Sequence, residues 1–270
     1  MTTPVIAFNN RKGGVGKTTM SVTTAVGLSA KGYRIGVIDS DSQGNAGLML
    51  GLPEADGLFN VLIERQPLEK WVMDAGSQIP EAADGKPLGA LYVLPSAART
   101  YKIPYELPQE EIFAFLGLTQ QFADEYKLDA VILDTAPTMS MFDGAIYLAA
   151  DAYVYVTECE RMSLDGLLVA EEQMRRMIQK RETYLQRSSQ IVGIIPNKAR
   201  NTLVHRRNIE ALQKHFGELC WEPIPLGTMW TEASNAEQTV FTYGAAQREA
   251  VIAWSIVEKV EAACLIANRL

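Results

Sequence analysis

A glycine-rich segment between an apolar run and a helical pattern constrains the fold of this chain most. It reads Lys12-Gly-Gly-Val-Gly-Lys-Thr-Thr19, follows the apolar run 5–9 and opens a helical pattern over 17–30. Glycines in a strand–loop–helix turn let backbone N–H groups surround phosphate oxygens, and the helix N-terminus adds its positive end. This context favours a phosphate-binding loop in an α/β fold over a turn that carries two unused lysines.

The residues of this loop have separate expected roles. In the ordinary motif, Gly-x-x-x-x-Gly-Lys-Thr, the lysine reaches the β- and γ-phosphates and the threonine hydroxyl faces Mg²⁺. Those roles fall to Lys17 and Thr18. Arg11 stands at the first glycine position, so the ordinary motif is not met. The remaining loop contacts to the nucleotide are expected from Gly13, Gly14, Val15, Gly16 and Thr19.

Lys12, at the front of the loop, carries a resemblance to a known family. A lysine at this position resembles the signature lysine of the deviant Walker A, or MinD/ParA, ATPases. The resemblance implies that Lys12 reaches the nucleotide of a partner subunit, so that two copies form a homodimer around ATP and Mg²⁺. Phosphoryl transfer needs positive charge on the γ-phosphate oxygens, and a lysine supplied across a dimer could provide it. Lys12 is therefore expected to be both a nucleotide contact and a catalytic residue.

Two carboxylates follow the second apolar run. The run 34–38 leads into Asp39-Ser-Asp-Ser-Gln-Gly-Asn45. Ligands of open α/β sheets bind beyond the carboxyl ends of the strands, which is where these side chains fall. The segment resembles the Asp-x-Asp-x-Gln-Gly-Asn switch of the same family. The resemblance implies that Asp39 supports the Mg²⁺ region and that Asp41 orients or polarises the attacking water. The simpler alternative is an aspartate-rich turn.

A third carboxylate ends another apolar run. Residues 130–133 are apolar and are followed by Asp134. Alone this pattern is common, but after a phosphate loop it resembles a Walker B strand, whose aspartate holds Mg²⁺ through water. The expected metal site therefore comprises Thr18, Asp39 and Asp134.

The run 190–196 is followed by a candidate reader of the base. The sequence continues Asn197-Lys-Ala-Arg200, which differs from the Asn-Lys-x-Asp motif of GTPases. An aspartate in that motif accepts hydrogen bonds from guanine, and an arginine has no acceptor atom. The resemblance assigns Asn197 to the adenine edge and favours ATP over GTP. Asn197 could equally cap the helix that follows.

Apolar runs and helical patterns alternate along the whole chain. Such an order predicts one three-layer α/β domain over 1–270, with a mostly parallel central sheet and helices on both faces, and the phosphate loop makes it a deviant P-loop NTPase fold. Residues 53–90 are rich in proline and glycine and predict a short helix at 58–64 within a long surface excursion. The strands are expected at 5–9, 34–39, 91–94, 130–134, 152–157 and 190–196, and the longer helices at 17–30, 109–127, 163–186, 203–216 and 245–268.

Basic residues concentrate in one part of an acidic chain. The net charge is −7, yet residues 175–214 hold ten Lys/Arg against two Glu. Such a zone is typical of a polyanion-binding face, although a solvated helix face is an equal alternative on composition alone. Tyr184 is the only Phe, Trp or Tyr among these basic residues, which is no interleaved aromatic pattern of the kind that suggests base stacking, so DNA binding would be sequence-independent. The candidate DNA contacts are Arg175, Arg176, Lys198, Arg200, Arg206 and Arg207.

Composition excludes several other classes of protein. Three widely spaced cysteines fit neither a disulfide framework nor a zinc site, so the cytoplasm is the expected location. No apolar run approaches the ~18 residues of a membrane span. An apolar stripe in 245–268 could serve a MinD-like membrane cycle, but its mixed charges favour docking onto the domain. The cysteine positions do not match those of a nitrogenase-reductase-like cluster carrier. A bacterial tyrosine kinase would carry a C-terminal tyrosine cluster, whereas Tyr243 is the only tyrosine after Tyr184 in this chain.

The resemblance extends over most of the chain and carries its functional expectation. Cys159-Glu-Arg-Met-Ser-Leu-Asp-Gly-Leu167 and the later Ile224-Pro225 and Thr231-Glu-Ala233 resemble ParA segments, while the residues after Val240 depart from the family pattern. The resemblance implies a small ParA-type ATPase that binds non-specific DNA as an ATP-bound dimer and associates with the nucleoid. A ParB-like or cargo adaptor protein would stimulate its slow hydrolysis, and the cycle would position DNA or another large cargo. The chain starts directly at the first strand, so no N-terminal helix-turn-helix domain is expected.

Overall fold

A seven-stranded, mostly parallel sheet forms the centre of the molecule. The computed structural model describes residues 2–81, 88–111, 113–137, 141–160, 171–172, 175–176 and 178–266. The strand order is β3-β4-β2-β5-β1-β6-β7, and every neighbouring pair is parallel except β3 with β4. The strands are β1 Val5–Asn9, β2 Arg34–Asp39, β3 Met73–Asp74, β4 Ala90–Leu94, β5 Ala130–Asp134, β6 Ala152–Glu158 and β7 Gln190–Asn197.

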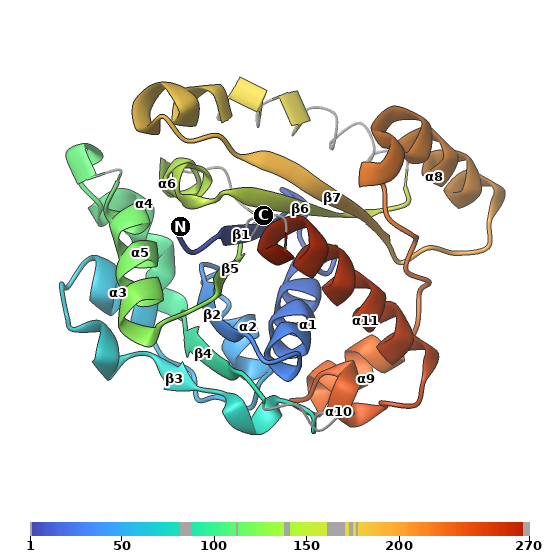
Figure 1. The fold of residues 1–270 in the computed structure, drawn as a ribbon, viewed down its shortest axis with the longest axis horizontal. Helices are drawn as coiled ribbons and strands as arrows, with labels where there is room; N and C mark the ends of the chain where they lie inside the picture. Colours follow the sequence, from blue (N-terminus) through green and yellow to red (C-terminus); the bar gives the residue numbers. More distant parts are fainter. Residues whose placement is uncertain are drawn as a thin grey trace.

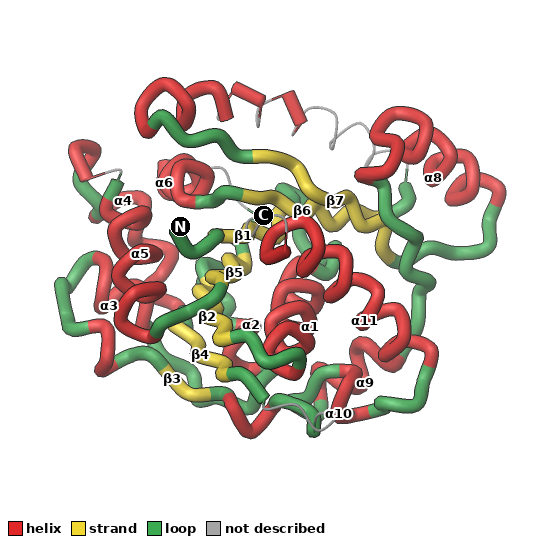
Figure 2. Tube along the Cα trace, in the orientation of Figure 1, coloured by secondary structure: helices red, strands yellow, loops and turns green. Residues whose placement is uncertain are grey.

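Helices cover both faces of this sheet, as Figures 1 and 2 show. Alternate residues of β1 enter separate cores. Ile6 and Phe8 pack with α1 and α11, whereas Val5 and Ala7 pack with α3, α5 and α6. This is the three-layer α/β domain that the sequence predicts. The helices are α1 Lys17–Ala30, α2 Asn45–Leu48, α3 Gly57–Leu62, α4 Ile103–Glu106, α5 Ala114–Tyr126, α6 Met141–Ala149, α8 Leu203–Phe216, α9 Met229–Asn235, α10 Val240–Tyr243 and α11 Arg248–Glu261.

The central strands are apolar along their length because both of their faces are buried. Every residue of β1 and β5 is buried. A strand covered on two sides gains from apolar residues at each position, which explains the absence of polar alternation in the sequence. The polar exceptions are at the carboxyl ends, where Asp39 of β2 lies directly opposite Asp134 of β5. The sheet thus brings the two predicted carboxylates together.

The last long helix docks along the first. Ala253, Val257 and Val260 of α11 are buried in the core that α1 also lines. A Cβ at Gly27 would lie 2.4 Å from Val257 Cγ2, so glycine permits the close approach of the two helices. The apolar stripe of this helix therefore packs on the domain, as its mixed charges suggest. Within the described ranges, no helix is long and apolar enough to span a membrane.

The excursion over residues 53–90 differs from its sequence-based interpretation. Leu58, Phe59 and Leu68 are buried and join the core on the α5 side of the sheet, so this part of the chain is not merely a surface segment. It also supplies β3, a two-residue antiparallel edge strand. Two residues are too short for a periodic pattern to reveal, and the proline and glycine residues concealed the buried ones.

Two predicted helices differ from the observed ones at their ends. The helix expected at 109–127 begins only at Ala114, after a separate 3₁₀ turn at Gln109–Glu111. The helix expected at 245–268 is α-helical over Arg248–Glu261 and continues as a π-helix at Ala262–Ile266. Of the helix expected at 163–186, residues 171–172, 175–176 and 178–185 are helical, and its expected start at 163–170 lies outside the described residues.

Candidate active site

The loop between β1 and α1 has the backbone of a phosphate cradle. Gly14 and Gly16 adopt φ angles of 73° and 101°, in the left-handed region that favours glycine. A Cβ at Gly16 would lie 2.4 Å from Asn197 Nδ2, so this position has no room for a side chain. The same Nδ2 donates a hydrogen bond to Val15 O at 2.7 Å. The end of β7 therefore holds the loop in its curved shape.

Lys17 begins α1 and lies inside the cradle. Its side chain is only 6% exposed, and Nζ lies 3.4 Å from Lys12 O. Burial lowers the pKa of Lys17, and the charges of Asp134 and Asp41 partly oppose that shift. Among the described residues, no carboxylate forms an ion pair with Lys17. An anion bound in the loop would therefore gain a desolvated counter-charge.

Asp134 is a buried carboxylate whose oxygens have no hydrogen-bond partner within the described structure. Burial raises its pKa to about 6, while the neighbouring Thr18 and Ser21 hydroxyls and the Lys17 charge act in the opposite direction. Buried polar atoms in native proteins are nearly always satisfied, so two orphaned oxygens at this point indicate an absent partner. A hydrated Mg²⁺ beside Thr18 is such a partner, because Mg²⁺ prefers oxygen ligands and keeps several of its waters. The residues present thus fit the expected metal.

The unpaired Asp134 carboxylate gives a pH-dependent prediction. Its pKa rises from 3.8 to about 6 on folding, so between these pH values the folded chain keeps a proton that the unfolded chain has released. Stability therefore falls as pH rises through this window, by on the order of 3 kcal/mol in total. Asp134→Asn removes that loss. The stability advantage of the variant over wild type should grow between pH 5 and pH 7 in nucleotide-free, Mg²⁺-free protein, as measured by urea unfolding.

An exposed aspartate supplies the control for this experiment. Asp124 lies on the solvent side of α5, and Asp124→Asn should change stability by the same small amount at both pH values. If the Asp134→Asn and wild-type curves run parallel with pH, Asp134 is not an unpaired buried carboxylate.

Asp39 organises the loop that follows β2. Its Oδ1 accepts a hydrogen bond from Asp41 N at 2.9 Å, and its Oδ2 accepts one from Ala46 N at 3.0 Å. Burial raises the pKa of Asp39, and the nearby charge of Asp134 raises it further. Both oxygens are already used to shape the loop, so the structure gives Asp39 a positioning role. Its expected contribution to the Mg²⁺ region stays a prediction.

Asp41 lies at the start of this same loop. Its Oδ1 accepts a hydrogen bond from Gln43 N at 3.0 Å, and its carbonyl accepts one from the Ser96 hydroxyl. A Cβ at Gly44 would lie 2.5 Å from Ser96 O, so the loop packs tightly on the residues after β4. The sequence analysis did not single out Ser96, although its position just beyond a strand is a usable signal. The role of Asp41 in orienting water stays a prediction.

Lys12, at the front of the loop, pairs with two carboxylates at and just after the end of β6. Its Nζ pairs with Glu158 and lies 3.2 Å from Glu160, and its side chain is 43% exposed. The hydrogen bond to Glu158 raises the pKa of Lys12, against the opposing effect of burial. Glu158 also pairs with Lys198 at 3.2 Å, and Lys198 donates to Gly14 O. Sequence reasoning missed Glu158, although it ends β6, a direct neighbour of β1.

A small cavity continues from the cradle toward β7 and α9. Its volume is about 230 Å³, and it lies between the glycines of the loop and the segment 225–231. Asn197 lines it, but its Oδ1 already accepts from Lys198 N at 2.8 Å, and its Nδ2 donates to Val15 O. One N–H and one lone pair of the amide remain for a ligand. Its assignment to the adenine edge stays a prediction.

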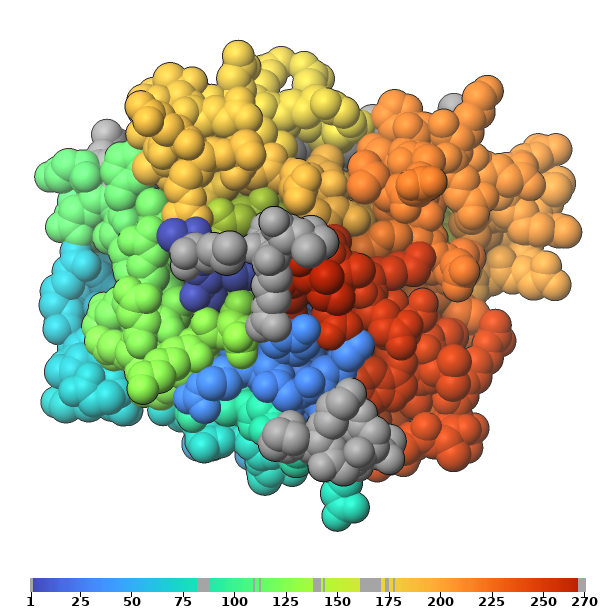
Figure 3. All heavy atoms as spheres, viewed as in Figure 1, coloured from blue at the N-terminus to red at the C-terminus, as the bar shows by residue number. Residues whose placement is uncertain are grey.

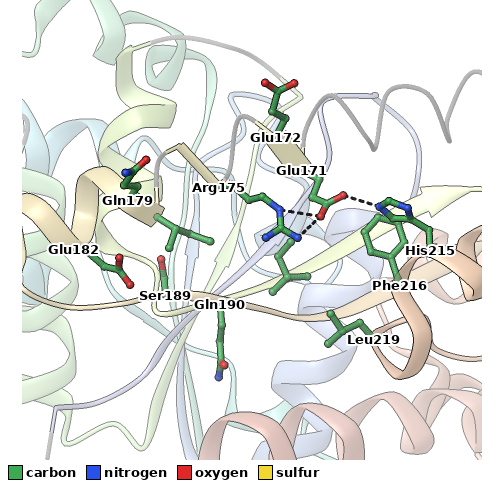
Figure 4. Close-up of a pocket in the computed structure, with 12 residues that line it drawn as sticks. Glu171, Glu172, Arg175, Gln179, Glu182, Ser189, Gln190, His215, Phe216 and Leu219 are labelled. Carbon is green, nitrogen blue, oxygen red and sulfur yellow. Dashed lines mark hydrogen bonds and ion pairs between the residues drawn. The ribbon is translucent and has the colours of Figure 1, made fainter.

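The six candidate DNA contacts fall into three separate places. Arg175 and Arg176 form ion pairs with Glu171 and Glu172 on the same helical segment. Glu171 also bonds His215 of α8 at 3.1 Å, and this network lines a cavity of about 980 Å³ beside β7, away from the phosphate loop (Figure 4). Burial alone would raise the pKa of Glu171, but the bonds from Arg175 and His215 lower it.

The other four basic residues are not together either. Lys198 contacts the phosphate loop, as described above. Arg200, Arg206 and Arg207 are exposed on α8 or just before it. Among the described residues, none of these three arginines forms an ion pair.

A glycine cradle, a buried lysine at the helix start and an orphaned carboxylate on the neighbouring strand define a P-loop nucleoside triphosphatase. Comparisons with known proteins agree. The "AAA domain" family model AAA_31 matches residues 3–190. The chain belongs to this family and is a P-loop ATPase of the ParA/MinD type.

Individual relatives match over most of the chain. Chromosome-partitioning ATPase Soj of Thermus thermophilus is 29% identical over 240 residues, which cover 87% of this chain and 86% of that protein. Chromosome partitioning protein ParA of Caulobacter vibrioides is 27% identical over 251 residues, with coverage of 88% and 86%. The fold is similar to that of the septum site-determining protein MinD from Pyrococcus horikoshii complexed with Mg-ADP, with a TM-score of 0.75, 19% identity and coverage of 97% and 96%.

Proposed function

We propose that this ATPase dimerises around Mg-ATP, binds DNA without sequence preference while dimeric, and positions DNA or another large cargo in the cytoplasm. The position of Lys12 carries this proposal. Its side chain pairs with Glu158 and Glu160 and is partly exposed, which suits a residue that acts on a second copy. Relatives whose names assign them to chromosome partitioning support the positioning role.

The geometry supports a division of labour within each nucleotide site. Lys17 would bind the β- and γ-phosphates, and Thr18 and Asp134 would hold Mg²⁺, which neutralises charge on the phosphate oxygens when bound. Asp39 would keep the loop after β2 in place, so that Asp41 can orient the attacking water. Lys12 of the second copy would complete the positive charge around the γ-phosphate. Hydrolysis would then require both copies, and a ParB-like or cargo adaptor protein would accelerate it.

The exposed arginines of α8 are the best supported DNA contacts. This helix projects at the right of the molecule, in orange in Figure 3. Arg206 and Arg207 are exposed and form no ion pair with a described residue, whereas Arg175 and Arg176 are each matched by a glutamate. Unpaired surface arginines lose no partner when they neutralise a phosphate. A dimer would present two copies of this surface.

Replacing both Arg206 and Arg207 with alanine is expected to reduce the salt dependence of DNA binding. Each arginine on a phosphate contributes about 0.9 to the slope of log affinity against log salt concentration, so the slope should fall by about 2 to 4 per dimer. The measurement is a salt titration of binding to an arbitrary duplex with a slowly hydrolysed ATP analogue. Lys70→Ala/Lys102→Ala, on the α3–α4 side of the molecule, is the control and should leave the slope unchanged.

Two outcomes would contradict this part of the proposal. An unchanged slope in the Arg206/Arg207 variant would mean that these two arginines do not contact DNA phosphates. Absence of DNA binding by wild type at low salt would remove the DNA-carrier role altogether. The MinD-like alternative has less support, because the apolar stripe of α11 is already buried against α1.

A further inference from the structure

The cavity beyond the phosphate loop has the size and chemistry of a nucleobase site. Its volume of about 230 Å³ is below the roughly 300–1,000 Å³ of pockets for drug-sized ligands, so it suits one flat ring system. Gly14 and Gly16 form one side, and Pro225 and Gly227 form the other. Lys198 is the only charged residue among its described lining residues. An uncharged ring next to a bound triphosphate matches these walls.

Trp230 is the large aromatic residue that lines this cavity. It lies near the start of α9, and its Cδ1 would be 4.0 Å from a Cβ at Gly227. The residue is only partly buried, yet its indole N–H has no hydrogen-bond partner among the described residues. The ring packs in part against the core that α1 and α11 share, and its cavity-lining atoms and its N–H remain available to a ligand.

The other tryptophans have partners within the protein. Trp71 Nε1 donates to Gln66 Oε1 at 3.1 Å. The Trp254 ring lies 4.4 Å from the Phe241 ring, and Lys259 Nζ lies 5.7 Å from the centre of the Trp221 ring. Trp230 thus differs from the other three by its position on the cavity.

We propose that Trp230 stacks on the base of the bound nucleotide and supplies most of the affinity for its adenosine half. The inference rests on the nucleotide site proposed above and assigns it a residue that binds the base. Any nucleobase presents a flat π face to an aromatic ring, so stacking provides affinity where Asn197 has few hydrogen-bonding groups left. The phosphates would be bound independently, by the loop and Lys17.

Separate measurements with ATP and with tripolyphosphate test this division. Removing a base-stacking aromatic ring weakens binding by roughly 5- to 150-fold. Trp230→Ala should therefore raise the Kd for a slowly hydrolysed Mg-ATP analogue by that factor and leave the Kd for Mg-tripolyphosphate unchanged. Trp230→Phe should recover most of the ATP affinity. The ATP analogue should also change the tryptophan fluorescence of wild type and of Trp71→Phe, but not that of Trp230→Phe.

The possible results separate the inference from the function on which it rests. Wild-type affinity for the ATP analogue in Trp230→Ala would overturn the stacking role alone. Equal losses for ATP and for tripolyphosphate would also overturn it, because Trp230 would then support the fold of the site. Failure of wild type to bind either ligand would overturn the nucleotide site, and the role of Trp230 with it.

Discussion

Lys17→Ala should raise the Kd for Mg-ATP by roughly 30-fold to several-thousand-fold, which corresponds to about 2–5 kcal/mol. The reason is the burial of Lys17, which is 6% exposed at the start of α1. A desolvated triphosphate would lose its main counter-charge and leave Asp134 facing it unopposed. Isothermal titration with a slowly hydrolysed analogue measures this loss.

Two further variants make the result interpretable. Lys70→Ala removes an exposed lysine from the segment between α3 and β3 and should bind as wild type does. Lys17→Gln keeps most of the side-chain volume without the charge and should lose nearly as much affinity as Lys17→Ala. If the glutamine variant bound ATP normally while folded, the charge of Lys17 would not be the source of phosphate affinity.

Lys12→Ala should have a different result, because Lys12 is partly exposed at the front of the loop, whereas Lys17 is buried. We expect monomer affinity for Mg-ATP to stay within about threefold of wild type, since the residue contacts Glu158 and Glu160 rather than the loop interior. Turnover should fall by roughly 10³-fold or more, which is the lower range for a cation supplied across an interface to a γ-phosphate. Binding by titration and hydrolysis by phosphate release give the two values.

The matched control removes the intramolecular partner of Lys12 instead. Glu158→Gln keeps the lysine and should retain turnover, because the Lys12 charge that would act on a second copy is unchanged. If Lys12→Ala hydrolysed ATP at the wild-type rate, the cross-subunit role would be wrong. If it lost monomer binding as Lys17→Ala does, Lys12 would belong to its own site.

The fold could be predicted from the sequence wherever the pattern was long and regular. The strands Val5–Asn9, Arg34–Asp39 and Ala130–Asp134 have the bounds that their apolar runs predict. Helix α1 spans Lys17–Ala30, as expected. Strands buried on both faces leave a continuous apolar signal that local exceptions do not break. The short elements α2, α4 and β3 depend on tertiary contacts rather than on a repeating pattern, so no window of sequence revealed them.

The residues of the phosphate loop could be predicted from the sequence, but the side-chain contacts between segments that are distant in the sequence could not. The glycines, Lys17 and Asp134 were visible because a motif fixes their spacing on two strands. Contacts that join distant parts of the chain were not, such as Glu158 to Lys12 and Lys198 to Gly14. These pairs meet only because β6 and β7 run beside β1 in the sheet. Trp230 was hidden for the same reason, since only the fold brings α9 to the loop.

The mass of the wild-type protein in three nucleotide states tests the central claim most directly. Multi-angle light scattering should give the monomer mass of 29.8 kDa without nucleotide and with Mg-ADP, and twice that mass with a slowly hydrolysed Mg-ATP analogue. Dimerisation in the ATP-bound state alone is expected because Lys12 needs a γ-phosphate on the other copy to bind. A monomer in all three states, or a dimer in all three states, would contradict the claim that this ATPase dimerises around ATP.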